Sequence, residues 1–173
     1  MVSEAMPAAR LFLAIRLGRT GRLAEAREQL GMLRTDFGDV RFVVFDGFVV
    51  GVEAWLDATE GRYAEAVEKV RRALARAADQ VTRVIAPHMF SVHLTTAAIA
   101  LTGLDGGLRA PDAARCLAVC DQLLPPGHLP SVMEREVRAE AEAGVRAVLG
   151  DAAYEAAYAE GGGLSLEEAA ALV

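Results

Sequence analysis

A six-residue phrase that occurs twice constrains the fold of this chain more than any other feature. Gly-Arg-x-Ala-Glu-Ala stands at Gly21–Ala26 and again, 40 residues later, at Gly61–Ala66. Each copy follows an apolar stretch with helical spacing, and a weaker third copy at Ala110–Leu117 places Ala113 at the phrase's last alanine. Repeats of roughly 20–50 residues are typical of stacked helical pairs, because one pair cannot bury its apolar face alone.

Helical periodicity and an alanine-rich composition predict helices over most of the chain. Only Arg41–Phe45 alternates like a strand, and its continuous apolar continuation favours helix there too. Gly18 is expected in the left-handed conformation just past the first helix. The helices expected in three hairpins are Ala5–Leu17 with Arg22–Leu33, Val43–Thr59 with Arg62–Ala78, and Pro87–Thr102 with Pro111–Leu123.

The strongest break in the chain is the proline-rich segment Leu124–Pro130. Two Ser-x-x-Glu capping boxes follow, at Ser131–Glu134 and Ser165–Glu168, and each predicts the start of a further helix. The sequence therefore predicts an all-α fold, a right-handed superhelix of antiparallel helical hairpins (an α-solenoid) with a helical cap. Residues 1–123 would form the three hairpins, and residues 124–173 the capping helices of the same domain.

Charge and hydropathy exclude several classes of function. The net charge is −6 and there is no long basic run, so direct binding of nucleic acid by this segment is not expected. Asp46, Glu53 and Asp57 interrupt the most apolar stretch, and no membrane span or signal peptide is predicted. Cys116 and Cys120 lie one turn apart on a single expected helix, where a disulfide would constrain nothing, so a cytoplasmic protein is predicted.

Three acidic residues form the first candidate binding site. Asp46, Glu53 and Asp57 share one face of an otherwise apolar helix. They could line a concave groove that accepts a protein partner or a peptide bearing arginine or lysine. The alternative, which the sequence favours, is that they pair with Arg10 and Arg16 of the preceding helix or face water.

Two further sets are candidates for a groove or a ligand surface. His88, Ser91 and Thr95 form a polar set that could line the same groove, or could be ordinary hydroxyls bonded to their own helix backbone. The aromatic residues Phe45, Phe48 and Trp55 are a candidate apolar surface for a small molecule or for a homodimer.

No catalytic, metal or cofactor site is predicted. His88 and His93 lie about 140° apart around a helix, so they cannot jointly hold a metal ion from one face. His128 stands in the proline-rich loop, while Ser131 and Ser165 are explained as helix caps. Neither a nucleophile elbow nor a glycine-rich phosphate loop occurs, and the chain is not expected to be an enzyme.

The Gly-Arg-x-Ala-Glu-Ala turns resemble the tetratricopeptide-like repeats of actinobacterial transcriptional regulators. The segment from Leu149 to Ala169, with its Leu-Gly, Tyr154, Tyr158 and Leu-Ser-Leu-Glu-Glu-Ala elements, is similar to the end of the helical-repeat region in large regulators of this kind. Those proteins join a DNA-binding domain and a switch ATPase to a helical sensor arm. This chain departs from them in Gly161–Gly163, and it contains no nucleotide-binding loop and no helix-turn-helix.

The resemblance implies a tetratricopeptide-like domain that recognises a protein partner or an effector in transcriptional regulation or signal transduction. Other domains of a longer chain would then be its partners, and Phe12 and Leu13, with no obvious neighbour, fit that expectation. The alternatives are a helical receptor for a small molecule, or a free-standing adaptor that forms homodimers.

Overall fold

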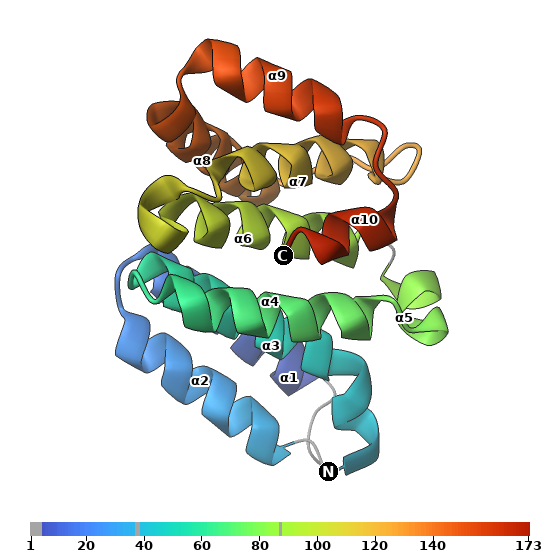
Figure 1. Cartoon of the computed structure of the whole chain (residues 1–173). Helices are drawn as coiled ribbons and strands as arrows, with labels where there is room; N and C mark the ends of the chain where they lie inside the picture. The colour runs from blue at the N-terminus through green and yellow to red at the C-terminus, as the bar shows by residue number, and fades with distance from the viewer. Residues whose placement is uncertain (1–4, 37–38, 87) are drawn as a thin grey trace.

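The structure, a computed structural model, describes residues 5–36, 39–86 and 88–173 (Figure 1). Every regular element in these ranges is a helix, which confirms the all-α prediction there. The elements are α1 Ala5–Arg19, α2 Leu23–Asp36, α3 Asp39–Thr59, α4 Tyr63–Ala77, α5 Gln80–Ile85, α6 Met89–Gly103, the 3₁₀ helix η1 Leu104–Gly107, α7 Ala110–Gln122, α8 Val132–Leu149, α9 Asp151–Gly161 and α10 Leu166–Ala171. The expected helix start at Pro87 lies outside the described residues.

The repeated phrase forms the same turn in both of its copies. Gly21 and Gly61 each adopt φ +77°, a conformation that costs glycine little because it has no Cβ. The backbone N–H of the next residue, Arg22 or Arg62, then donates to the carbonyl five residues earlier, at 2.9 and 2.8 Å. This pattern ends one helix and turns the chain into the next.

Gly18 has a different role from the one the sequence predicts. It lies inside α1, where a Cβ would stand 2.5 Å from Cζ3 of Trp55 on α3. The left-handed position belongs to Gly21 instead. Gly18 therefore lets the indole ring approach the α1 backbone, a tertiary contact that no local pattern shows.

The last alanine of each repeat is closed off from solvent. Ala26, Ala66 and Ala113 are all fully buried, as the alignment of the three copies leads one to expect. One turn further on, Leu30 and Leu117 are also buried. A small residue followed by a large one at these positions lets the helices of each pair approach closely and still fill the space between them.

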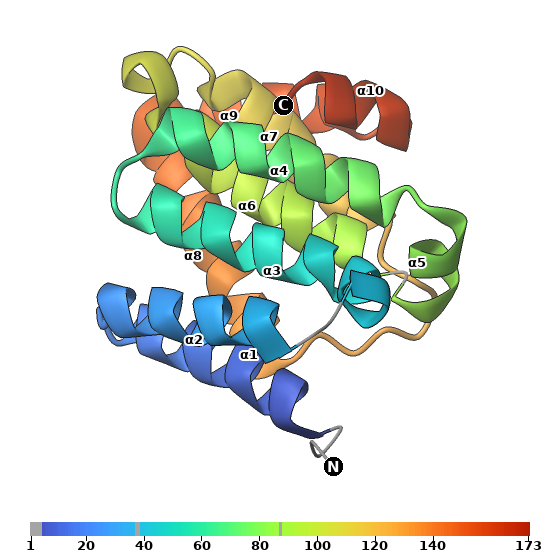
Figure 2. The same cartoon turned by 90° about the horizontal axis from the view of Figure 1, so that it is seen from below.

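The helices pair and stack in chain order (Figure 1). α1 packs on α2, α3 on α4 and α6 on α7, while α4 and α3 both pack on α6. α9 covers α7, and α10 returns to pack against α7 as well. Figure 2 shows α8 on the same side of the stack as α1 and α3.

Both predicted capping boxes are present. The Glu134 N–H donates to Ser131 Oγ at 3.2 Å, and the Ser131 N–H donates to Glu134 Oε2 at 2.7 Å. Ser165 and Glu168 make the same reciprocal pair at the start of α10. Each box satisfies two backbone donors that the first helical turn leaves free.

Two short elements differ from the prediction. α5 was not expected, and η1 lies between Thr102 and Pro111, where the sequence predicts no helix. In η1, Asp105 and Gly106 take φ values of 51° and 67° in succession, so the connection is wider than the two Gly-Arg turns. Within the described ranges, no helix has the length and apolar character needed to cross a membrane.

Candidate ligand-binding cavity

A cavity of about 500 Å³ lies between α1, α3, α6, the α7–α8 connection and α8. Pockets of this size are typical of sites for small molecules. Most of the lining is apolar and comes from four helices. The large apolar lining residues are Leu11, Phe12, Ile15, Phe48, Val52, Trp55, Met89, Val92, Met133 and Val137 of these helices, with Leu124 and Pro130 of the α7–α8 connection.

α8 forms the outer wall of the cavity. Its N-terminal half, through Glu140, contains no buried residue, and the buried positions Ala141 and Val145 come later. Arg19 of α1 donates to Glu136 of α8 at 2.7 Å, and this ion pair joins two of the helices that line the cavity. Phe12 remains 61 % exposed, so the cavity is open to solvent beside α1.

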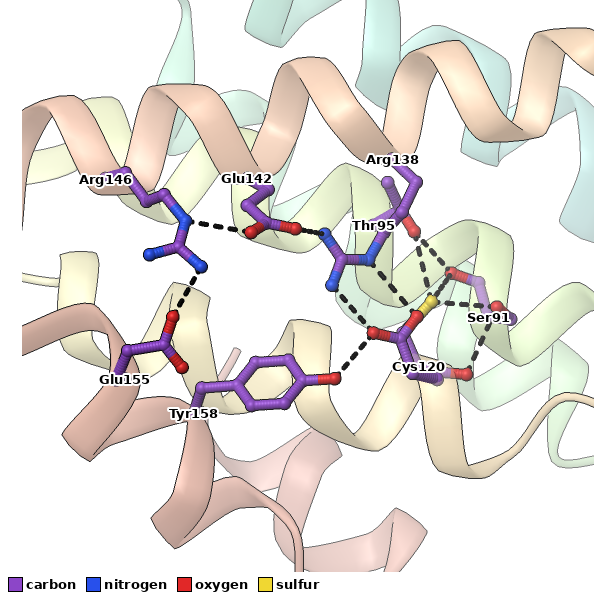
Figure 3. A network of polar contacts seen from close by, with 9 residues as sticks. Ser91, Thr95, Cys120, Arg138, Glu142, Arg146, Glu155 and Tyr158 are labelled. Carbon is purple, nitrogen blue, oxygen red and sulfur yellow. Dashed lines mark hydrogen bonds and ion pairs between the residues drawn. The ribbon is translucent and has the colours of Figure 1, made fainter. Parts of the chain in front are cut away.

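The α6 wall carries hydroxyl groups that are bonded within the protein. Ser91 Oγ lies 2.8 Å from Cys120 Sγ, and Thr95 Oγ1 donates to the Ser91 carbonyl at 2.9 Å (Figure 3). Thr96 donates to the Val92 carbonyl at 3.2 Å. Burial raises the pKa of the Cys120 thiol, which keeps it protonated at neutral pH.

A charged network continues from this wall onto α8 and α9. Arg138 lies 2.7 Å from Asp121 and 3.0 Å from Glu142, and the Tyr158 hydroxyl donates to Asp121 at 2.7 Å (Figure 3). Burial, together with the hydrogen bond to Asp121, raises the pKa of Tyr158 to about 12. The network ties α7, α8 and α9 together, and two of its members, Asp121 and Arg138, line the cavity.

Two histidines meet at the cavity near the start of α6. The rings of His88 and His128 stack with centroids 5.8 Å apart, and His128 Nε2 lies 3.2 Å from Glu134 Oε1. His128 is therefore bound to two elements, although in the sequence it stands alone in a proline-rich loop. All three residues line the cavity.

Among the described residues of α6 that line the cavity, His93 is the one whose buried polar atoms lack a hydrogen-bond partner. It is 1 % exposed, and neither ring nitrogen has a hydrogen-bond partner among the described residues. A Cβ on Gly51 of α3 would stand 2.7 Å from its Nδ1, so the imidazole lies directly against the α3 backbone. Burial lowers the pKa of His93 to about 4, and the ring is neutral at pH 7.

The predicted acidic set lies on the other side of α3. Asp46 pairs with Arg76 of α4 at 3.2 Å, and Glu53 with Arg34 of α2 at 2.9 Å. These carboxylates have cationic partners, as the favoured alternative expected, but the partners come from α2 and α4 rather than from α1. None of the three acidic residues lines the cavity, and a role for them in partner binding stays a prediction.

Asp57 is the most deeply buried of the three, at 1 % exposure. Its carboxylate lies 2.7 Å from Arg27 and 2.5 Å from Arg62, and it also pairs with Lys69. Burial acts to raise the pKa of Asp57, but hydrogen bonds from Lys69, Arg62 and Arg27 outweigh it and hold the pKa below its usual value. This carboxylate is fully engaged in the fold.

Of the other predicted site residues, all but Phe45 line the cavity. His88, Ser91 and Thr95 line the cavity together with Phe48 and Trp55. Phe45 packs on Phe48 with ring centroids 6.0 Å apart but is not part of the lining. Two sets that the sequence left separate, one polar and one aromatic, thus meet at one site.

Sequence reasoning missed His93 as a site residue and missed the whole contribution of α8. A histidine on α6, which is apolar almost all round, was the available signal, since such a helix is buried on every side. The position of α8 had no local signal, because it depends on the path of the connection before Ser131.

Among the described residues, no three His, Cys, Asp or Glu side chains are grouped so that they could hold a metal ion. Cys116 and Cys120 are both buried and unbridged. Comparison of the chain with family models, with curated proteins and with solved structures found no match.

Proposed function

We propose that this chain is a non-catalytic effector-sensing domain that binds a mainly apolar small molecule in the cavity between α1, α3, α6 and α8. The observation that carries the proposal is the cavity itself, whose exposed surface is mainly aromatic and aliphatic although polar and charged side chains also contribute to its walls. That composition is the usual one for small-molecule sites. A ligand would replace water against Phe48 and Trp55 and gain from the apolar surface that it buries.

The repeated Gly-Arg turns and the stacked hairpins support a tetratricopeptide-like superhelix as the framework for this site. In that framework the first helix of each pair would line the concave face. A ligand held between α1 and α8 would favour the arrangement in which these two helices are close, and so shift a conformational equilibrium. Such a shift is how a sensor arm could signal to a protein partner or to attached regulatory domains.

The proposal is tested with the neutral apolar dye N-phenyl-1-naphthylamine, whose emission rises in apolar surroundings. We expect saturable binding by the native chain and about tenfold weaker binding by Val137→Asp. Val137 lines the cavity from α8, and a carboxylate at that position would be desolvated by a bound dye.

Val132→Asp is the matched control, because Val132 lies on the same helix, is exposed and does not line the cavity. It should bind the dye as the native chain does, and circular dichroism should show equal helicity in all three proteins. Absence of saturable binding by the native chain, or equal weakening by both substitutions, would overturn the proposal.

A further inference from the structure

The ring of His93 identifies the kind of polar group that a ligand would carry into the cavity. The hydroxyl groups on the α6 wall already have partners: Ser91 Oγ bonds Cys120 Sγ of α7, and Thr95 and Thr96 donate to backbone carbonyls. His93 alone on this wall has two buried nitrogens with no partner among the described residues.

A buried polar atom without a hydrogen bond costs free energy of folding, so the burial of the His93 ring in this state needs a physical explanation. A water-filled or ligand-filled cavity beside the ring supplies one. His93 and Gly51 both belong to the cavity lining, and the bare backbone at Gly51 leaves room for the imidazole between α3 and α6. A polar group that reached the ring from the cavity would complete its hydrogen bonding.

We infer that His93 is the polar anchor of the cavity, and that the ligand is a mainly apolar compound with one uncharged hydrogen-bonding group, such as a hydroxyl. This inference rests on the proposed function. A neutral imidazole offers one N–H donor and one acceptor, which matches a hydroxyl in either direction. A carboxylate would meet no positive charge on this ring and would lose its hydration against the apolar walls. Of the arginines that line the cavity, Arg19 and Arg138 are already paired with Glu136 and Asp121, and Arg135 donates to the Pro130 carbonyl.

The test uses three probes with one ring system: 2-naphthol, naphthalene and 2-naphthoate. Each is titrated against the native chain loaded with N-phenyl-1-naphthylamine. We expect 2-naphthol to displace the dye at about tenfold lower concentration than naphthalene, because only the naphthol hydroxyl can form a hydrogen bond with the buried His93 ring. The naphthoate should displace it least well.

Two variants separate the imidazole from the other polar groups of the wall. In His93→Leu the advantage of 2-naphthol over naphthalene should disappear, while naphthalene itself displaces the dye as before. Thr96→Val is the matched control, because it removes a cavity-lining polar group whose hydroxyl is already bonded to Val92. The control should keep the full preference for 2-naphthol.

A measurement on the native chain keeps the test decisive if His93→Leu does not fold. The ¹⁵N resonances of the His93 ring should shift on addition of 2-naphthol and stay in place on addition of naphthalene. Equal displacement by the two probes, a preference that survives in His93→Leu, or unchanged ring resonances would overturn the inference. If the dye itself fails to bind, the proposed function fails instead, so the two failures are distinguishable.

Discussion

α3 contributes to two buried polar sites that are opposite in character. At its C-terminal end, Asp57 is surrounded by three cationic side chains from α2, α4 and the turn between α3 and α4. One helical face away, Gly51 packs against His93, which has no partner among the described residues. Both side chains are 1 % exposed, so burial alone does not distinguish them.

The difference lies in what surrounds each group. Asp57 stands where two hairpins meet, and its partners hold α2, α3 and α4 together, so its charge is a structural element. His93 lines a cavity whose surface is mainly apolar. A buried polar group with all its hydrogen bonds made stabilises one fold, whereas a buried group that lacks hydrogen bonds and lines a cavity is suited to a reversibly bound ligand.

The largest expected effect comes from removing the charge of Asp57. Asp57→Asn leaves Lys69 without its carboxylate partner and leaves Arg27 and Arg62 to share Glu60, and breaking a buried ion pair costs roughly 3–5 kcal/mol. Urea denaturation should show a loss of this size in the free energy of unfolding.

Glu53→Gln is the control, because Glu53 pairs with Arg34 in a more exposed ion pair. The cost there should stay below about 1 kcal/mol. A loss below 1 kcal/mol for Asp57→Asn as well would mean that the buried network does not hold the hairpins together.

A smaller effect is expected from the pH dependence of stability at His93. Its pKa is about 4 in the folded protein, below the value of about 6.5 in an unfolded chain, so the unfolded state takes up the proton first as the pH falls. The contribution is complete above pH 6.5 and is lost between there and about pH 4, a loss of about 3 kcal/mol.

His93→Leu should lack this loss and should match the native stability at pH 7 within about 1 kcal/mol, since it removes unsatisfied polar atoms. The measurement is urea denaturation of both proteins at several pH values. Parallel pH profiles for the native chain and the variant would show that His93 is not buried in its neutral form.

Much of the local structure could be predicted from the sequence. The two Gly-Arg turns and both Ser-x-x-Glu boxes depend on contacts within a few residues, and they form as expected. The buried alanines follow from aligning the three repeat copies. The short helix α5 was missed because six residues carry too little periodicity to distinguish a helix from a loop.

The cavity could be predicted only in part. Sequence analysis named five residues that line the cavity: Phe48, Trp55, His88, Ser91 and Thr95. They were named because they were expected on the first helix of each pair. The sequence could not show that α8 returns to α1 through Arg19 and Glu136, 117 residues apart. Contacts at that separation depend on the whole chain path.

The most direct test of the account is energy transfer from Trp55, the only tryptophan, to bound N-phenyl-1-naphthylamine. Trp55 lines the cavity, so excitation of the indole should give sensitised dye emission and matching quenching of the tryptophan. In Trp55→Phe the sensitised emission should vanish while directly excited dye emission remains. Saturable dye binding with no transfer from Trp55 would place the dye elsewhere and contradict the account.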